Sequence, residues 1–434
     1  MAKSMPYERP RGTRDYLPEE CRVRRKVMER LRSVFESYGY GEIVTPAFEH
    51  LELLSAKAGE EVVDQIYSFS DKAGRKLGLR FELTTPIARI VAERADLWKP
   101  VRFYYIQPVW RYEEPQRGRL REFWQAGVEL IGLPGVMGDS EVVAVMVNAL
   151  RKAGLTKFTV HVNDRRLIEG LLQWAGLDAE RIPAALRVID KLEKRGVEYV
   201  RGELGSLIRD SGRLSRLMEY LTSEDPLSLP IDDLPPAARE GALSLRELLE
   251  ELDESYGILS YVKPDLSIVR GLDYYTSLVY ETKTPLGGEL GSVAGGGRYD
   301  DLIKLVGGPP LPATGVAIGV ERLIEALEAE GSLDVRKARR GVIIIPVKRE
   351  LVRAAIRIAE RLRDHGLSTI VDLTGRKVSS ALESADKQGF RYAVIIGKQE
   401  VESGLLTLRD LEKWEERRMP LEQLLNELLS SAEQ

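Results

Sequence analysis

Residues 122–131 place a side-chain amide and a carboxylate on one face of a predicted strand. Because side chains alternate between the two faces of a strand, Phe123, Gln125, Gly127, Glu129 and Ile131 share a face. Buried polar groups need hydrogen-bond partners, and a glycine inside a strand often marks the close approach of a ligand. The row therefore predicts the floor of a ligand-binding site, although a solvated hairpin accounts for this stretch alone equally well. The opposite face, with Trp124, Ala126, Val128 and Leu130, is wholly apolar and is expected to face a core.

Three arginines are candidates for binding a polyphosphate. The chain has neither a G-x-G-x-x-G motif nor a P-loop, so phosphates would need another device. Guanidinium groups can supply it, because they are permanently charged and present a fork of donors. Arg111, Arg270 and Arg322 each lie on a predicted strand or where one ends, so one shared phosphate site is a coherent hypothesis. For any one of them alone, a structural ion pair is the commoner role.

A hairpin is expected to position the first of these groups. An apolar run at 101–110 ends at Arg111, an arginine-rich loop broken by Pro115 and Gly118 follows, and the strand 122–131 comes next. Downstream, residues 313–322 predict a strand that runs into a helix presenting Arg322, and residues 265–281 predict a strand that carries Arg270.

The N-terminal part of the chain predicts a helix and several short strands. The helix begins at Pro18, has apolar residues at helical spacing and ends at Gly39, and a strand at 42–45 follows it. A hairpin turns near Gly74, and a strand at 79–84 would place Glu82 and Thr84 on one face. Thr84 with the following Thr-Pro also predicts the start of a helix. On this segment alone, a helix cap and a solvated carboxylate explain the two residues better than a binding site does.

The middle of the chain changes character twice. Asp139 and Ser140 are expected to cap a helix at 141–153, and a strand is expected at 157–163. Residues 164–249 then predict charged amphipathic helices, which suggest a helical insertion within the first domain. Residues 294–300, AGGGRYD, would let the backbone approach a ligand closely; a flexible turn is the alternative.

The C-terminal hundred residues alternate between strand and helix patterns. After a polar linker at 331–340, strands are expected at 342–347, 368–373, 391–396 and 405–409, and helices at 351–362, 378–387 and 421–429. Alternation of this kind predicts a small separate α/β domain.

Composition narrows the class of protein. The chain has 434 residues, which predicts two or three domains, and 43% hydrophobic with 30% charged residues is a globular balance. No apolar run is long enough for a membrane span, and the N-terminus has no apolar stretch suited to a signal peptide, so a cytoplasmic protein is expected. One cysteine excludes an internal disulfide, and the three scattered histidines do not suggest a metal site. With a net charge of −4, binding to nucleic acid would depend on local patches.

Together these segments resemble the histidyl-tRNA synthetase family of class II aminoacyl-tRNA synthetases. The pattern R-x-E, an arginine-rich loop and R-E-F-x-Q-x-x-x-E at 111–129 resembles motif 2 of that class in its histidyl form. Residues 18–46 resemble the dimerisation motif 1, and residues 313–322 resemble motif 3. The most specific segments are Arg-Gly-Leu-Asp-Tyr-Tyr at 270–275 and Gly-Gly-Arg-Tyr-Asp at 296–300, which resemble the two histidine-specific motifs; the residues that follow at 276–281 look closer to the archaeal branch. Trp110 departs from the phenylalanine usual before the motif 2 arginine, and only a packing change is expected from it.

The resemblance implies a two-step reaction and a role for each site residue. ATP and histidine would form histidyl-adenylate and pyrophosphate, and the terminal ribose of tRNA(His) would then accept the histidyl group. Arg111 would bind the α-phosphate and the substrate carboxylate, Arg270 would take the place of a magnesium ion at the α-phosphate, and Phe123 would stack on adenine. The remaining residues implied in binding ATP are Glu113, Arg119 and Arg322. The residues implied in binding histidine are Glu82, Thr84 and Gln125 at the α-amino group and Glu129, Tyr274 and Tyr275 at the imidazole.

The resemblance also implies an architecture and partners. The fold would be an α+β catalytic core built on an antiparallel sheet (residues 1–163 and 250–330), interrupted by the helical insertion (164–249). It would be followed by an α/β anticodon-binding domain with a mixed sheet (338–434). At least one magnesium ion would accompany the phosphates of ATP, and the protein would be a homodimer. The motif 2 loop, with Gln116, Arg117 and Arg119, would lie near the acceptor end of the tRNA.

Two other interpretations remain open at this point. One is a class II synthetase of the threonyl, prolyl or glycyl type, which also carries a C-terminal α/β domain; the histidine-specific segments argue against it. The other is a synthetase-like regulatory subunit of histidine biosynthesis without aminoacylation activity. Such proteins usually lack the C-terminal domain and key arginines, whereas Arg111, Arg270, Arg322 and residues 341–434 are present in this chain.

Overall fold

The computed structural model describes residues 7–56, 63–116, 118–232, 234–269, 274–285, 291–333 and 340–432. The chain divides into two compact units, Met1–Leu333 and Asp334–Gln434, and each has its own hydrophobic cores. Most of the linker expected at 331–340 lies outside the described residues.

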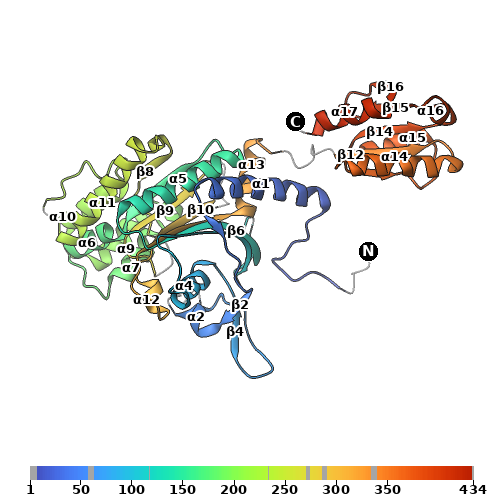
Figure 1. Cartoon of the computed structure of the whole chain (residues 1–434). Coiled ribbons are helices and arrows are strands. Elements are labelled where there is room, and N and C mark those ends of the chain that lie inside the picture. The colour runs from blue at the N-terminus through green and yellow to red at the C-terminus, as the bar shows by residue number, and fades with distance from the viewer. Residues whose placement is uncertain are drawn as a thin grey trace, which may run out of the picture. The chain divides into compact units, whose positions relative to one another are not determined.

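An eight-stranded sheet is the centre of the first unit (Figure 1). In spatial order its strands are β1 (Gly41–Glu42), β5 (Val101–Trp110), β6 (Glu122–Ile131), β11 (Ala313–Gly319), β10 (Ala294–Arg298), β9 (Leu278–Lys283), β7 (Thr159–Asp164) and β8 (Val262–Pro264). The inner pairs are antiparallel, and only the edge strands β1 and β8 pair in parallel. The β5–β6 hairpin has the strand bounds expected from its apolar runs.

Helices cover one face of this sheet and bury its apolar side chains. Figure 1 shows several of them on the same side of the strands. They are α1 (Pro18–Ser37), α5 (Val136–Ala153), α11 (Pro236–Glu254) and α13 (Val320–Glu330). Ala126, Val128 and Leu130 are fully buried in the core beneath them, and Trp124 packs at its margin. The prediction that this face of 122–131 meets a core is confirmed.

The opposite face of the sheet meets a second core. Ile131 is buried in it and Phe123 packs against it, so the two faces of β6 separate as the alternation predicted. This core includes α4 (Thr84–Glu93) and α12 (Leu302–Leu305). Beside α4 lie α2 (Leu51–Ser55) and a small sheet in the order β2 (Phe48–His50), β4 (Lys76–Leu79) and β3 (Ser68–Ser70) (Figure 1).

Most of the described residues between 165 and 254 are in helices, as the amphipathic pattern of residues 164–249 indicated. Before α11 they form α6 (Arg165–Trp174), α7 (Ile182–Ile189), α8 (Leu192–Arg195), α9 (Val197–Leu207) and α10 (Ser211–Thr222), and the short helix η1 (Leu259–Tyr261) follows α11. Their apolar side chains join the same core as the sheet, which explains how such charged helices fold onto this unit. Within the part of the chain that the structure describes, no helix is long and apolar enough to cross a bilayer.

Two short strands near the N-terminus differ from the expected ones. The strand expected at 42–45 is only Gly41–Glu42, because the carbonyls of Thr45 and Pro46 turn to the guanidinium of Arg80. The strand expected at 79–84 ends at Leu79. The chain leaves the sheet there because the carboxylate of Glu82 accepts hydrogen bonds from the first amides of α4, at 2.5 and 2.9 Å.

The helix expected at 141–153 begins earlier, at Val136, with Gly135 before it at φ 75°. Asp139 and Ser140 therefore lie in its first turn and are fully buried, not at a cap. The carboxylate of Asp139 instead forms a buried ion pair with Arg298, at 2.8 Å, which ties α5 to β10. Burial raises the pKa of Asp139 to about 6, and the charge of Arg298 acts in the opposite direction.

The strand expected over residues 265–281 is wrong for most of the part that is described. Only β9, from Leu278, is strand, while Asp265 begins a turn in which its carboxylate accepts from Ser267. Arg270 lies outside the described residues. The glycine-rich segment is a fully buried strand, β10, and not a flexible turn.

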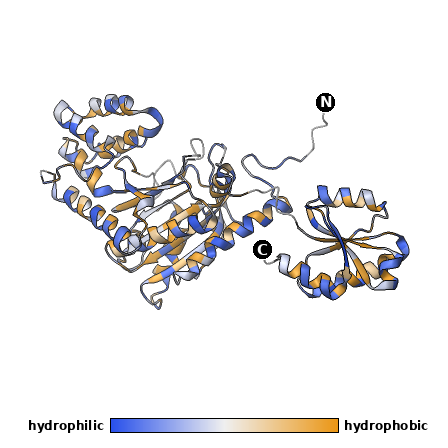
Figure 2. Ribbon diagram, turned by 90° about the horizontal axis from the view of Figure 1, so that it is seen from above, coloured by the Kyte–Doolittle hydropathy of each residue, from blue (hydrophilic) through white to orange (hydrophobic). Residues whose placement is uncertain are grey.

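The second unit is an α/β domain around a five-stranded mixed sheet. In spatial order its strands are β13 (Thr369–Val371), β12 (Arg340–Pro346), β14 (Phe390–Ile396), β15 (Leu405–Asp410) and β16 (Glu416–Pro420). Its helices are η3 (Arg349–Leu351), α14 (Val352–Asp364), α15 (Val378–Lys387), α16 (Lys398–Ser403) and α17 (Leu421–Ala432). The first three strands are parallel and the last two antiparallel, so the expected mixed sheet is confirmed; β16 and α16 were not predicted. Figure 2 shows strands of this sheet coloured as hydrophobic between helices that alternate in colour, as expected of a two-sided core.

Candidate active site

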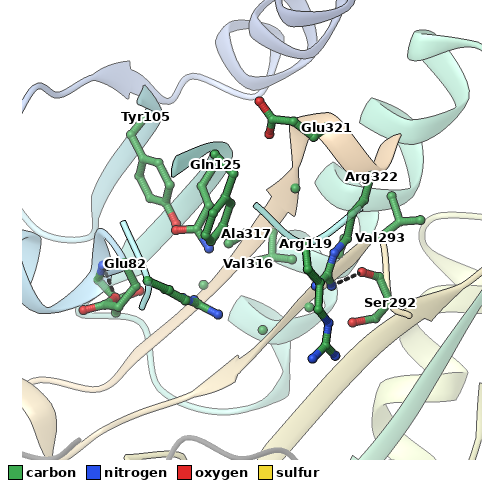
Figure 3. A pocket seen from close by; sticks show the side chains of 18 of the residues that line it. Glu82, Tyr105, Arg119, Gln125, Ser292, Val293, Val316, Ala317, Glu321 and Arg322 are labelled. Carbon is green, nitrogen blue, oxygen red and sulfur yellow. Dashed lines mark hydrogen bonds between the residues drawn. The ribbon is translucent and has the colours of Figure 1, made fainter. Parts of the chain in front are cut away.

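A cleft on the first unit brings the predicted site residues together (Figure 3). It encloses about 910 Å³ of empty space, part of it open to solvent. Of the twelve residues proposed from the sequence, eleven line it: Glu82, Thr84, Arg111, Glu113, Arg119, Phe123, Gln125, Glu129, Tyr274, Tyr275 and Arg322. The twelfth, Arg270, lies outside the described residues. The row on β6 is thus the floor of a cleft and not a solvated face.

Glu129 is the most enclosed polar group of the cleft. Its side chain is 1% exposed, and hydroxyl groups from three elements donate to it. Thr84 Oγ1 donates to Oε1 at 2.8 Å, the Tyr105 hydroxyl lies 3.4 Å from the same oxygen, and the Tyr299 hydroxyl donates to Oε2. The carboxyl group is therefore held in one orientation before any ligand arrives.

The environment of Glu129 changes its protonation. Burial raises the pKa of this carboxyl group to about 8, because the charged form loses hydration. The hydrogen bonds from Tyr299, Thr84 and Tyr105 oppose this effect, while the negative charge of Glu82 adds to it. A carboxyl group so poised near neutral pH, at the inner end of a cleft, is a candidate for direct contact with a ligand that can exchange a proton.

Gly315 makes the space that Glu129 occupies. The register of β6 with β11 places the two residues opposite each other, and a Cβ atom at 315 would lie 1.8 Å from Glu129 Oε2. No side chain fits there without moving the carboxyl group. The strand glycine at 127, in contrast, accommodates the ring of Tyr105, since a Cβ at 127 would lie 2.5 Å from its hydroxyl oxygen. The expectation that Gly127 marks the approach of a ligand is replaced by this packing role.

Replacing Gly315 by alanine should displace the Glu129 carboxyl group and close the inner end of the cleft. We expect the KM for the ligand that contacts Glu129 to rise by about a hundredfold, because a buried polar group left without its partner costs up to about 3 kcal/mol. Replacing Gly212 by alanine is the control, since that position lies on the exposed α10 and its nearest atom is 3.3 Å away. Circular dichroism would establish that both variants fold, and an unchanged KM in the folded Gly315→Ala variant would contradict this account of the cleft.

Glu82 and Thr84 both lie in the cleft wall but not on a shared strand. Glu82 uses its two oxygens to accept from the backbone amides of Thr84 and Thr85, which fixes the start of α4. The hydroxyl of Thr84, freed from capping, donates to Glu129. Glu82 therefore brings a carboxylate to the cleft wall, and Thr84 beside it holds the carboxyl group of Glu129 in place.

Gln125 presents an unpaired acceptor to the cleft. The residue is 8% exposed, and among the described residues its Oε1 atom is buried with no hydrogen-bond donor. A buried acceptor without a partner is costly, so the arrangement suits a ligand that brings a donor. An α-ammonium group, close to the negative charge of Glu82, meets that need.

Arg111 and Phe123 lie together at the outer part of the cleft. The guanidinium of Arg111 donates to the carbonyl of Phe81 through Nε at 3.0 Å and lies 5.3 Å from the centre of the Phe123 ring. Glu113 lies between two arginines, at 3.9 Å from Arg111 and 3.9 Å from Arg119. An aromatic face beside fixed guanidinium groups can hold a planar base next to phosphate.

Arg322 connects three parts of the cleft. It donates to the carbonyl of Gly118 in the motif 2 loop at 3.1 Å and to the carbonyl of Ser292 at 2.8 Å, the second contact being drawn in Figure 3. Both acceptors are backbone carbonyls, and these contacts orient the guanidinium. With Arg119 it brings two guanidinium groups to this end of the cleft, and guanidinium groups are well suited to binding a polyphosphate.

Sequence reasoning missed several residues of the cleft. Tyr105 and Glu321 gave no signal by themselves, since one lies in a generic apolar run and the other in a helix start. Tyr299 belongs to the segment 296–300, whose resemblance to a histidine-specific motif was the signal that could have found it. Within the described ranges, no three His, Cys, Asp or Glu side chains lie close enough to hold a metal ion.

The sheet and its site define the class of protein. A largely antiparallel sheet, covered by helices on one face and bearing a cleft lined by arginines without a P-loop, fits the catalytic fold of class II aminoacyl-tRNA synthetases. The family model for histidyl-tRNA synthetase matches residues 12–323, and an anticodon binding domain matches residues 341–431.

Individual relatives agree with the family match. A histidine–tRNA ligase of Thermococcus kodakarensis is 41% identical over 433 residues, which cover 98% of each chain. The crystal structure of histidyl-tRNA synthetase from Nostoc sp. PCC 7120 superimposes with a TM-score of 0.85 at 27% identity, over 99% of this chain and 100% of that one. A Bacillus halodurans structure, described as an ATP phosphoribosyltransferase regulatory subunit/histidyl-tRNA synthetase, gives 0.74 at 30% identity over 88% and 97%. The chain belongs to the histidyl-tRNA synthetase family.

Proposed function

We propose that this protein is a ligase that activates L-histidine with ATP and transfers it to the 3′ end of tRNA(His). The observation that carries the proposal is the cleft, which has an enclosed carboxyl group and amide at one end and arginines at the other. The histidine–tRNA ligases to which the chain is similar match it over nearly its whole length.

Histidine would occupy the inner end of the cleft. Its α-ammonium group supplies the donor that Gln125 Oε1 lacks, near Glu82 and Thr84. Its imidazole offers one donor and one acceptor when neutral and two donors when charged, which Glu129 and the phenol of Tyr275 can satisfy from two sides. Tyr274 packs against Tyr275 with ring centres 4.9 Å apart and so supports that phenol.

ATP would occupy the outer part, with adenine on Phe123 and its amino group near Glu113. Arg111 would hold the α-phosphate and the histidine carboxylate side by side, while Arg119 and Arg322 would bind the far phosphates. A carboxylate oxygen of histidine then bonds to the α-phosphorus, and the bond from that phosphorus to the oxygen bridging to the β-phosphate breaks. Fixed guanidinium groups lower this barrier because they neutralise charge without reorganising.

Magnesium would be brought by ATP and not held by a protein cluster. Both oxygens of Glu82 and of Glu321 accept hydrogen bonds from the protein, Glu129 is buried, and Glu113 is proposed to lie at the adenine amino group, so the phosphate oxygens would supply most of the non-protein ligands of this ion. Phosphate oxygens with few protein ligands are a common environment for Mg²⁺. The ion would add positive charge at the outer phosphates.

The remaining partners are proposed from the family. The second unit, which matches the anticodon binding domain, would bind the anticodon of tRNA(His). Gln116, Arg117 and Arg119 would lie near the acceptor end of the tRNA, although Arg117 lies outside the described residues. We also propose that the protein is a homodimer located in the cytoplasm. A regulatory subunit without ligase activity is not favoured, because the ligases match both units of the chain.

Transfer of labelled histidine to a tRNA(His) transcript tests the proposal directly. Charging that needs ATP and is absent with a tRNA of another specificity is expected. If the folded protein binds histidine but charges no tRNA, the regulatory alternative replaces the proposal.

Changing Arg270 to histidine should lower the rate of adenylate formation by about 10² to 10³, because this guanidinium is proposed to stabilise charge at the α-phosphate. The measurement is histidine-dependent exchange of pyrophosphate into ATP. A matched change, Arg201→His, on the surface of α9 should leave the rate unchanged. Wild-type exchange by the Arg270→His variant would remove Arg270 from this role.

A further inference from the structure

Glu321 is a cleft residue with no assigned part in binding histidine or ATP. It precedes Arg322 in the first turn of α13, and its residue exposure is 7%. Arg24 Nη1 donates to Oε1 at 2.7 Å, the Tyr16 hydroxyl lies 3.3 Å from the same oxygen, and the backbone amide of Trp124 donates to Oε2 at 2.9 Å. In Figure 3 its carboxylate points away from the cleft, whereas Arg322 points into it. It therefore acts on the cleft through its neighbours.

The hydrogen bond between Glu321 and Trp124 lies where β11 ends and β6 continues without this neighbour. The ladder between β6 and β11 ends at the pair Gln125–Gly319, because the chain turns into α13 at Val320. Trp124 and Phe123 extend beyond this end on β6. The carboxylate of Glu321 takes the place of the missing carbonyl and accepts the first amide beyond the ladder. Without it, that amide would be partly buried and unpaired on this side of β6.

Arg24 forms a buried ion pair with this carboxylate. The Arg24 side chain comes from α1 and is 8% exposed, and its guanidinium carbon lies 3.9 Å from the centre of the Tyr16 ring. A buried ion pair with both partners hydrogen-bonded is fixed in geometry, since breaking either contact leaves an uncompensated charge. The pair thus fixes the start of α13 against α1 and against the loop-side end of β6.

We propose that Glu321 is a positioning residue that sets the distance between Phe123 and Arg322, the two residues proposed to hold adenine and the far phosphates. One of its neighbours in sequence is Arg322, and its hydrogen-bond partner Trp124 adjoins Phe123. The inference rests on the proposed function for what these two residues bind. Gln125 and Glu129 stay in the β6–β11 ladder, so the histidine end of the cleft does not depend on Glu321.

The test compares Glu321→Gln with Glu141→Gln in the full-length protein. Glu141 is a matched control: its carboxylate accepts from Arg102 at 2.9 Å and from Tyr40 at 2.9 Å, and it lies outside the cleft lining. Both changes remove one charge from an arginine pair. Pyrophosphate exchange at a temperature where both variants are folded gives separate KM values for ATP and histidine.

We expect Glu321→Gln to raise the KM for ATP roughly tenfold, the kind of loss caused by a small misplacement of binding groups, and to leave the KM for histidine within about twofold. Glu141→Gln should change neither. A parallel rise in both KM values, or no rise in the KM for ATP, would overturn the proposal and leave Glu321 a purely structural ion pair.

A second variant, Glu321→Asp, keeps the test possible if Glu321→Gln does not fold. Glu321→Asp keeps the charge beside Arg24 but is one methylene too short to reach both Arg24 and the amide of Trp124. It should show the same selective rise in the KM for ATP, by about threefold to tenfold, and an unchanged KM for ATP would overturn the proposal. Absence of exchange by the wild-type protein would instead contradict the proposed function.

Discussion

Replacing Glu129 by glutamine will raise the KM for histidine by about a hundredfold and leave the KM for ATP within about threefold. An ordinary hydrogen bond contributes about 0.5–1.5 kcal/mol, and a buried partner left unpaired costs about 1–3 kcal/mol more. At about 1.4 kcal/mol for each factor of ten, these terms together give a loss of this size. The glutamine amide also presents hydrogens toward the hydroxyls of Thr84 and Tyr299, which now donate to the carboxyl group.

Pyrophosphate exchange at varied histidine and fixed ATP measures this effect, with Glu141→Gln as the control that makes the same change outside the cleft. A KM for histidine equal to that of the wild type would show that Glu129 does not contact the amino acid. A joint rise in both KM values would point to a general distortion of the cleft.

The same variant should change how stability depends on pH. The pKa of Glu129 is raised to about 8 in the folded protein, above its ordinary value of 4.5, so the folded state keeps a proton that the unfolded state releases. This contribution to stability is fully present below about pH 4.5 and is lost as the pH rises towards 8. The free energy of unfolding of Glu129→Gln, relative to the wild type, should therefore increase between pH 5 and pH 8 in urea titrations. A constant difference would mean that Glu129 is ionised throughout.

Replacing Arg111 by alanine will lower the rate of adenylate formation by about 10² to 10³, the usual cost of removing one fixed group that stabilises developing charge. The guanidinium is oriented before substrates bind, by the carbonyl of Phe81 at 3.0 Å and the ring of Phe123 at 5.3 Å. Lysine keeps the charge but loses the fork of donors and the stacking. We therefore expect Arg111→Lys to recover less than about a tenth of the wild-type rate.

Single-turnover formation of histidyl-adenylate at saturating substrates separates this effect from weakened binding. Arg75→Ala, a change at an exposed arginine that pairs with Asp71 near the turn of a hairpin, is the control. A wild-type rate in Arg111→Ala would exclude a role at the α-phosphate. A wild-type rate in Arg111→Lys would mean that charge alone, and not the fork, is what matters.

The hydrophobic pattern of the sequence predicted a helix or strand correctly wherever no tertiary contact acted against that pattern. The β5–β6 hairpin, α15 and the strand before Arg322 follow their hydrophobic patterns closely. The strand predicted at residues 79–84 was wrong. An apolar and β-branched run favours a strand, but the carboxylate of Glu82 accepts two hydrogen bonds from the first amides of α4, and the chain therefore turns into the helix. The prediction that Asp139 caps a helix was wrong because its ion-pair partner, Arg298, is distant in the sequence and a local pattern does not reveal it.

The resemblance to a known family predicted which residues, far apart in the sequence, would lie together in the site. Alternation alone placed Gln125 and Glu129 on one face, but it could not show that Thr84, Tyr105 and Tyr299 converge on the same carboxyl group. Nor could it show that Gly315 makes room for that group from a neighbouring strand. Such contacts depend on the register of strands that are almost two hundred residues apart in the chain, which no local pattern contains.

We propose that the enclosed end of the cleft selects histidine for activation by ATP. Amino-acid-dependent exchange of pyrophosphate into ATP, measured with each of the standard amino acids, tests it most directly. The structure predicts exchange with histidine alone. Exchange with a different amino acid would preserve the fold and contradict the roles of Glu129, Gln125 and Tyr275, and no exchange with any amino acid, by folded protein that binds histidine, would contradict the proposed enzyme.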